Sequence, residues 1–240
     1  MRRRSFMGIV CGLALLALVP VPVSAQSVDE IVARNLQAKG GLDKLRSIQT
    51  IRQTSKVLMP QGTSETVVVL SKRPNLLRQE ITVGGKKVVF AFDGKTAWAV
   101  NPLVGVGTPV VVMGPQAEAI RQQSDFDGPL VDYRARGSKL ELVGLETVNG
   151  RQLHHLRLID KNGQTQHYYL DPETGLEARI TFATEGGEFE QEFSDYRDVD
   201  GIKVPFSVRM LANGVAQSTF TVQKVEFNAK FDDAIFKIPK

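Results

Sequence analysis

Three histidines have the clearest chemical potential, because an imidazole can bind a metal ion or transfer a proton near neutral pH. His154 and His155 are adjacent in a stretch typical of a strand, so their side chains point to opposite faces and cannot easily share one metal ion. His167 lies on the next expected strand and could approach one of them across a hairpin. Two ligands are still fewer than the four of a closed zinc site. We therefore expect an ordinary pair of strand histidines and no metal site.

Carboxylates gather at Asp195, Asp198 and Asp200, just before Gly201, in a spacing loosely similar to a calcium-binding loop. The rest of the twelve-residue pattern is missing, which favours a solvated turn. The sequence also contains no HExxH, GxSxG, phosphate-binding-loop or dinucleotide-binding motif. We therefore expect no catalytic residues and no cofactor, and we do not expect an enzyme.

The beginning of the chain has the three parts of a secretory signal peptide. Arg2–Arg4 form a positive region, an apolar run follows over 6–19, and Pro20 and Pro22 precede the small residues Val-Ser-Ala that end at Ala25. The run is shorter than the roughly 20 apolar residues of a membrane-spanning helix. We expect cleavage after about Ala25 and export to the periplasm, which leaves a single domain over 26–240.

The remaining chain is close to electrically neutral. Lysine and arginine total 30 against 26 acidic residues, and the three leader arginines account for most of the excess. This balance lacks the basic surface that nucleic acid requires, so we exclude nucleic acid as a partner. Cys11 is the only cysteine and lies inside the apolar run, so we expect neither a disulfide nor a lipid anchor in the exported chain.

A helix should open this domain, because Ser27 and Glu30 form a capping-box pair and Gly40-Gly41 ends the pattern. A short turn over 42–45 and a middle segment over 115–123 could also be helical. The rest alternates between apolar and polar residues with explicit turns such as Gly84-Gly85, which predicts antiparallel hairpins. The expected strands are 51–58, 65–71, 76–83, 87–92, 96–101, 139–145, 151–159, 164–170, 176–184, 189–196, 203–211 and 215–227.

The alternation predicts one wet face and one apolar face along these strands, and therefore one large curved sheet. Phe90 and Phe92 share a face, as do Trp98 and Val100. The few helices must cover this apolar face, since soluble proteins rarely expose large apolar patches. The apolar, glycine-rich segment 101–114 is expected to add a strand and a turn, and it could also form a mobile flap over an apolar cavity.

Two stretches resemble the outer-membrane lipoprotein carrier family, whose periplasmic member ferries acylated lipoproteins. The first is Lys-Arg-Pro-Asn-Leu over 72–76, and the second is Asp-Gly-Lys-Thr over 93–96 followed by Trp98 and Asn-Pro-Leu-Val over 101–104. The resemblance covers residues 27–108, and the distal half is similar only in general pattern.

This resemblance implies a mostly antiparallel β fold with few helices, forming an unclosed, strongly curved β-barrel with helices as a lid over an apolar cavity. It also implies that Arg73 hydrogen-bonds the lid. By alternation Arg73 shares a face with Val67 and Val69, the face expected to line the cavity. The predicted ligand-binding residues are Arg73, Val67, Val69, Phe90, Phe92, Trp98 and Val100.

The expected function is that of a periplasmic chaperone that binds an acylated lipoprotein or another apolar lipid and shuttles it towards the outer membrane. The implied partners are lipoprotein acyl chains or lipid, an inner-membrane lipoprotein-releasing transporter and an outer-membrane acceptor, and the carrier itself is expected to be a monomer. One alternative is a module that senses lipid or lipoprotein without transport. A second alternative is a hydrolase, against which the missing nucleophile–base pair argues.

Overall fold

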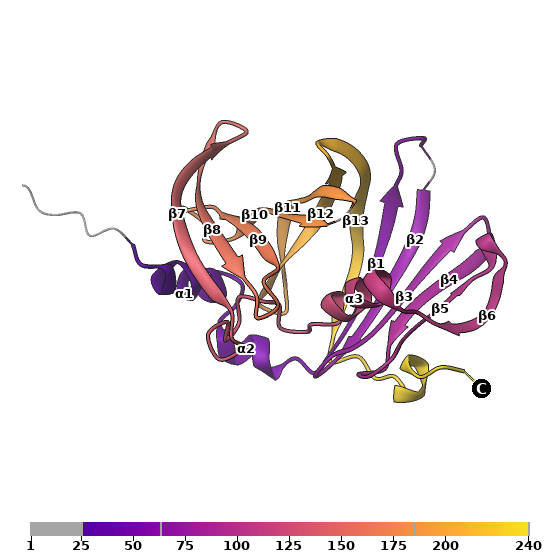
Figure 1. Ribbon diagram of the computed structural model, residues 1–240. Helices are drawn as coiled ribbons and strands as arrows, with labels where there is room; N and C mark the ends of the chain where they lie inside the picture. Colours follow the sequence, from indigo (N-terminus) through magenta and orange to yellow (C-terminus); the bar gives the residue numbers. More distant parts are fainter. Residues whose placement is uncertain (1–25, 63, 185, 240) are drawn as a thin grey trace, which may run out of the picture.

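The computed structural model describes residues 26–62, 64–184 and 186–239. The expected signal peptide, residues 1–25, lies outside these described residues. Within them the strands form one antiparallel sheet of 13 strands, which bends round from β7 at one edge to β6 at the other (Figure 1). None of the described helices is both long enough and apolar enough to cross a membrane.

Three α-helices accompany the sheet: α1 (Val28–Ala38), α2 (Leu42–Ser47) and α3 (Gly114–Gln123). Two short 3₁₀ helices occupy η1 (Pro102–Val104) and η2 (Asp233–Phe236). The strands are β1 (Thr50–Leu58), β2 (Ser64–Lys72), β3 (Leu76–Val83), β4 (Lys86–Phe92), β5 (Ala97–Asn101), β6 (Val106–Val111), β7 (Lys139–Val148), β8 (Arg151–Ile159), β9 (Thr165–Leu170), β10 (Glu177–Thr184), β11 (Gly187–Val199), β12 (Ile202–Ala212) and β13 (Val215–Phe227).

The strand order is β6-β5-β4-β3-β2-β1-β13-β12-β11-β10-β9-β8-β7. Strands β1–β6 therefore form one meander and β7–β13 form a second. The two meanders join through the pairing of β1 with β13, in which Ile51 lies opposite Phe227. The prediction of a mostly antiparallel, unclosed and strongly curved sheet with few helices is confirmed.

Helix α1 begins with the expected capping box. The side chain of Ser27 accepts a hydrogen bond from the backbone N–H of Glu30, and the Glu30 carboxylate accepts one from the backbone N–H of Ser27 at 2.7 Å. This reciprocal arrangement satisfies two of the N–H groups that a helix start leaves free. Its buried residues Ile31 and Val32 pack against Leu156, Leu158 and Tyr168 of the sheet, and other apolar side chains complete this cluster.

Helix α3 covers the same, concave face of the sheet at its other end. Ile120 packs with Leu77, Phe92 and Ala97, and the partly buried Phe90 lies beside them. The two helices thus lie over opposite walls of one trough (Figure 1). The stretch of sheet between the two helix-covered clusters forms the floor of this trough.

The convex face of β4 and β5 is also apolar, which corrects the expectation of a single apolar face. Val89, Ala91 and Trp98 form a buried cluster there, against which Ile238 packs. The indole Nε1 of Trp98 donates a hydrogen bond to the backbone oxygen of Phe236 at 2.7 Å. The C-terminal segment therefore covers this part of the convex face as the helices cover the concave one.

Candidate functional site

The concave face of the central sheet carries uncharged side chains over most of its length. Residues directly opposite one another in a ladder point to the same face, so the register identifies this face strand by strand. Val69 lies opposite Gln79, and Gln79 lies opposite Phe90, which packs under α3. At the other wall Leu142 lies opposite Leu156, which packs under α1. Both helix-covered clusters therefore lie on the same face of the sheet.

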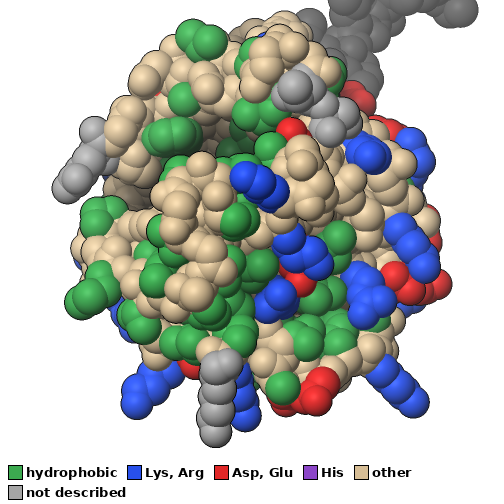
Figure 2. All heavy atoms as spheres, turned by 90° about the vertical axis from the view of Figure 1, so that its right-hand side faces the viewer, with side chains coloured by type: hydrophobic (Ala, Val, Ile, Leu, Met, Phe, Trp, Pro, Cys, Tyr) green, Lys and Arg blue, Asp and Glu red, His purple; other side chains and the backbone are tan. Residues whose placement is uncertain are grey.

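The middle of this surface is open. Phe182 lies opposite Phe189 with their rings stacked at 5.7 Å between centroids, and Phe193 lies opposite Val208, which lies opposite Phe220. All five side chains are only partly buried, and they belong to neither helix-covered cluster. The trough floor is therefore an accessible apolar surface rich in phenylalanine. The space-filling view shows a hollow in the upper part of the face on the β6 side (Figure 2).

Arg73 closes one end of the trough, directly after β2. Its Nε donates to the carbonyl oxygen of Ile48 at 2.7 Å, and its Nη2 donates to that of Leu45 at 3.1 Å. Its two terminal nitrogens also bind the two carboxylate oxygens of Asp127, each at 2.6 Å. The guanidinium lies 4.5 Å from the ring centroid of Phe126, in cation–π geometry. Arg73 thus connects three segments: the end of β2, the α2 region and the loop after α3.

We call the contacts of Arg73 with Asp127, Leu45 and Ile48 the clasp. A small cavity of about 160 Å³ lies beside it. Its walls include Arg73, Phe126, Ile51, Val225 and Phe227. Pockets for drug-sized ligands usually measure about 300–1,000 Å³. A long acyl chain therefore does not fit this cavity as it stands, and a bound chain must lie along the open trough or displace α3 and the Phe126–Asp127 loop.

Helix α1 is fixed more firmly than α3. Asn35, fully buried, donates through Nδ2 to the carbonyl oxygen of Gly175 at 2.8 Å. Lys39 pairs with the buried Glu177 at 2.9 Å, and the Tyr196 hydroxyl donates to the Glu177 carbonyl oxygen. Burial alone would raise the pKa of Glu177, but the adjacent Lys39 outweighs it and lowers the pKa. Among the described hydrogen bonds, α3 has fewer such ties to the sheet than α1.

The structure brings four of the seven predicted ligand-binding residues together on one wall. Val67, Val69, Phe90 and Phe92 all lie on the concave face, with Val67 opposite Ile81. Of these, Val69, Phe90 and Phe92 pack in the α3 cluster. Arg73 lies at the end of the same face, where it donates to backbone carbonyl oxygens of the α2 region.

The structure does not bring Trp98 and Val100 to this wall. The hairpin places Ala91 opposite Trp98 and Phe90 opposite Ala99, so Trp98 points to the convex face. The assignment of Trp98 and Val100 to the trough lining is therefore wrong. The cause is the turn between β4 and β5, in which the Asp93 N–H donates to the Thr96 carbonyl oxygen. This turn fixes the register so that Ala99 and Ala97 lie opposite Phe90 and Phe92.

Sequence reasoning missed Phe126 and Asp127, the clasp partners of Arg73, because a loop carries no periodic signal. It also left the phenylalanines of the trough floor, among them Phe189 and Phe193, out of the site. Their alternation with Glu188, Glu190 and Glu192 was the signal that could have identified them.

The histidines meet as the hairpin suggested. His155 Nε2 and His167 Nδ1 lie 2.7 Å apart, and a Glu146 oxygen lies 2.9 Å from His155 Nδ1. Tyr169 stacks on the His155 ring at 4.5 Å. Burial lowers the pKa of His155, and the nearby Glu146 offsets this only in part. Among the described residues, no group of three or more His, Cys, Asp or Glu side chains is arranged to hold a metal ion.

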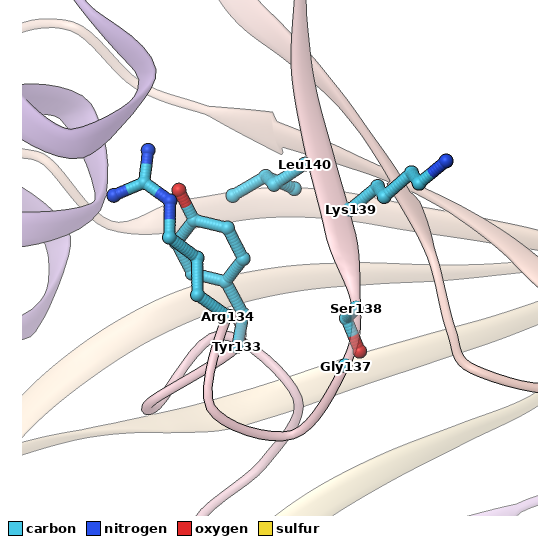
Figure 3. Close-up of a pocket in the computed structure, with 6 residues that line it drawn as sticks. All are labelled: Tyr133, Arg134, Gly137, Ser138, Lys139 and Leu140. Carbon is cyan, nitrogen blue, oxygen red and sulfur yellow. The ribbon is translucent and has the colours of Figure 1, made fainter.

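A second, shallow hollow of about 400 Å³ lies beside the start of β7 (Figure 3). Tyr133 and Arg134 line it and both bind Asp29 of α1, at 2.8 Å each. These two contacts lower the pKa of Asp29. Lys139 points away from the Tyr133 ring, and no predicted ligand-binding residue lies here. Because Tyr133 and Arg134 are engaged in holding α1, we assign this hollow a structural role.

No protein-family model and no curated protein sequence matches the chain. Solved structures do match its fold. A DUF1329 family protein from Desulfovibrio piger has a TM-score of 0.61 at 15% identity, covering 88% of this chain and 97% of its own. A LolA superfamily protein from Nitrosomonas europaea has a TM-score of 0.60 at 14% identity, covering 89% and 98%. The chain has a LolA-like fold.

A putative outer-membrane lipoprotein-sorting protein domain from Vibrio parahaemolyticus is similar as well, with a TM-score of 0.57 at 13% identity over 86% of this chain and 94% of its own. The LolA-like fold thus extends over nearly the whole of each matched chain. The resemblance read from residues 27–108 is confirmed at the level of the fold.

Proposed function

We propose that this protein is a periplasmic carrier that binds the acyl chain of a lipoprotein or another lipid in its trough and shuttles it towards the outer membrane. The observation that carries the proposal is the partly exposed phenylalanine floor around Phe182, Phe189, Phe193 and Phe220. Soluble proteins seldom leave a contiguous apolar surface of this kind without a partner. Burial of an acyl chain there contributes about 0.8 kcal/mol per methylene group.

The cover supports the same function. Helix α3 packs on the trough wall through few apolar side chains, chiefly Ile120 and Ala117, and the clasp of Arg73 on Asp127 holds the loop behind it. Release of the clasp would free α3 to move away as a chain enters, and its re-formation would favour discharge. A contact of this kind needs to change the balance between two states by only a few kcal/mol.

A carrier of this kind needs one protein that delivers its cargo and another that receives it. We propose an inner-membrane lipoprotein-releasing transporter as donor and an outer-membrane protein as acceptor, with the carrier acting as a monomer and without catalysis. The name of the Vibrio neighbour, an outer-membrane lipoprotein-sorting protein domain, supports such a role by fold analogy. The proposed location depends on the leader over residues 1–25.

A binding experiment tests the proposal. Protein purified from the periplasm and stripped of lipid should bind a fluorescent fatty acid, and added lipid should displace it. Phe220→Glu places a charge on the trough floor and should weaken binding at least about tenfold, because a buried carboxylate is costly. Thr221→Glu is the matched control, since this exposed neighbour on β13 points to the other face.

Native mass spectrometry with lipid extraction would identify the cargo. If delipidated protein does not bind the dye and carries no lipid from the periplasm, the carrier proposal is wrong. Equal weakening by Phe220→Glu and Thr221→Glu would show that the dye binds outside the trough.

A further inference from the structure

We propose that Gln191 binds the carbonyl group of an ester or amide linkage in a lipid that carries two or more acyl chains. The inference rests on the proposed carrier function and deepens it, because it names the chemical class of the cargo. Gln191 lies on β11, which the strand order places between the strands under α1 and those under α3 (Figure 1). The site is therefore in the middle of the trough floor.

Gln191 is surrounded by apolar side chains on all four sides. Phe189 and Phe193 lie two residues before and after it on β11 and point to the same face. Across the ladders, Gln191 lies opposite Ile180 of β10 and Met210 of β12. Gln191 and these four neighbours are all partly buried. One uncharged amide thus stands at the centre of an otherwise apolar surface.

The other face of β11 shows how this strand separates its polar groups. Glu188, Glu190 and Glu192 alternate with the phenylalanines and point to the convex face, where Glu192 pairs with Arg209. Polar side chains on the wetted face of an antiparallel sheet are ordinary. Gln191 is on the opposite, concave face, so contact of that wetted face with water does not account for it.

The amide of Gln191 differs from two other glutamine amides on the concave face. Gln53 donates through Nε2 to the Ser55 hydroxyl at 3.3 Å, and Gln166 accepts through Oε1 from the Tyr168 hydroxyl at 2.7 Å. Within the described part of the chain, the Gln191 amide makes no hydrogen bond, so water solvates it in the empty trough. A pure hydrocarbon that covered the floor would remove this water and leave the amide unpaired, which opposes binding.

A ligand that brings its own hydrogen-bonding group avoids this loss, and the surroundings indicate which group it is. The four neighbours of Gln191 include no lysine or arginine, so a carboxylate or phosphate would lack a counter-charge there. A hydroxyl at the end of an apolar molecule would not fit either, because apolar surface extends on both sides of Gln191.

An internal carbonyl group fits this arrangement. In a lipid with two or more acyl chains, ester or amide linkages lie inside the molecule, with apolar chains extending from them. The side-chain NH₂ of a glutamine can donate to the carbonyl oxygen of either linkage, and its own oxygen can accept from the N–H of an amide. The chains themselves would then lie on the phenylalanines.

A competition experiment tests the inference on the lipid-stripped protein loaded with a fluorescent fatty acid. The competitors are dioleoylglycerol, which has ester linkages, ceramide, which has an amide linkage, and squalene, which is a hydrocarbon without a carbonyl group. The readout is the ratio of the inhibition constants of squalene and each carbonyl lipid, so that the affinity of the dye cancels. We expect this ratio to fall at least about fivefold in Gln191→Leu, because the site no longer penalises a ligand without a hydrogen-bonding group.

Two further variants make the test specific. Gln191→Met keeps the length of the side chain and should lower the ratio in the same way, which maintains the test if Gln191→Leu does not fold. Gln152→Leu is the matched control, since Gln152 is exposed on β8, two residues from the turn at Gly150. Infrared spectra of dioleoylglycerol with isotope-labelled carbonyl groups should show a hydrogen-bonded carbonyl in the wild type, and this band should be lost in both Gln191 variants.

An unchanged ratio in both Gln191 variants, or an equal fall in Gln152→Leu, would overturn the inference and leave the carrier proposal standing. A fall for one carbonyl lipid alone would support the inference and identify the linkage as an ester or an amide. If the wild type bound neither the dye nor any of the three lipids, the carrier proposal would fail, and the assignment of Gln191 would fail with it.

Discussion

The guanidinium of Arg73 binds the carboxylate of Asp127 through two hydrogen bonds of 2.6 Å each. The same guanidinium donates to the carbonyl oxygens of Leu45 and Ile48. An arginine at this position can bind backbone carbonyl oxygens or a neighbouring carboxylate. The structure contains both, because the rigid fork of five N–H donors reaches several acceptors at once.

Breaking this clasp should destabilise the fold moderately. Arg73 and Asp127 side chains are 19% and 31% exposed, so each keeps some contact with water. We expect Asp127→Asn to lower the free energy of unfolding by about 1–2 kcal/mol, less than for a fully buried pair. Urea unfolding of Asp127→Asn, Arg73→Leu and the double variant gives the coupling energy. A coupling near zero would mean that the pair is only a surface contact.

The same clasp should control ligand release. We expect Arg73→Leu to fold, to bind a fluorescent fatty acid at least as tightly as the wild type, and to pass it to acceptor vesicles more slowly. In this variant the hydrogen bonds of Arg73 can no longer re-form when the ligand leaves. The closed, empty state therefore loses its advantage over the open, loaded state, and release becomes slower. Arg46→Leu is a suitable control, because Arg46 forms a single exposed pair with Asp132. Transfer at the wild-type rate by Arg73→Leu would remove Arg73 from the mechanism.

Trp98 should affect stability without affecting the ligand. Trp98→Phe loses the hydrogen bond to the Phe236 carbonyl and part of a fully buried side chain, so the free energy of unfolding should fall by about 1–3 kcal/mol. Dye affinity should stay within about twofold, because this cluster is on the convex face. Trp98 is also the only tryptophan, so its fluorescence should not respond to a ligand in the trough. A ligand-dependent change in emission would contradict the convex assignment.

Mild acid should weaken the fold through His155. The pKa of His155 is lowered in the folded state, mainly by burial, so the unfolded chain takes up a proton more readily. The stabilising contribution is therefore present above the ordinary histidine pKa of about 6.5 and is lost as the pH falls through the folded value.

Urea unfolding at pH 7.5 and pH 5.0 tests this sign. The free energy of unfolding of the wild type should be lower at pH 5.0, and His155→Leu should reduce the difference. The pKa of His154 is also lowered, by burial first and then by Arg34, so some dependence should persist in the variant. A wild type that is more stable at pH 5.0 would show that Glu146 outweighs burial.

Removal of metal or reduction of thiols should leave stability unchanged. The expected exported chain has no cysteine, and the described residues offer no cluster suited to a metal ion. Melting curves with a chelator and with a reductant should overlay that of the untreated protein. A large fall in melting temperature with chelator alone would direct attention to the His155–His167 pair or to the turn after Asp198.

Local patterns predicted most of the strands because their causes are local. The Ser27–Glu30 box starts α1 where expected, and turns such as Asn213-Gly214, with φ of 50° and 75°, close hairpins at the expected positions. The middle segment 115–123 corresponds to α3, and the segment 101–114 contains η1 and β6. In each case the residues that determine where the element begins or ends lie within it or directly beside it.

The parts that escaped prediction depend on contacts between distant segments. Trp98 and Phe236 are 138 positions apart, and nothing near Trp98 shows that a C-terminal segment covers it. The partnership of Arg73 with Asp127, 54 positions away, escaped prediction for the same reason. Alternation identified apolar faces but could not show which of two apolar faces a helix covers.

The order in which the strands pair has a consequence for how the protein folds. β1, near the start of the described chain, pairs with β13, near its end, in the middle of the sheet. Each meander can form hairpins from neighbouring segments, but the seam between them closes only when the last strand is available. Contacts so far apart in sequence slow folding. A chain still passing through a membrane pore would thus keep its two halves unjoined, and the trough would come into existence as the final step of folding.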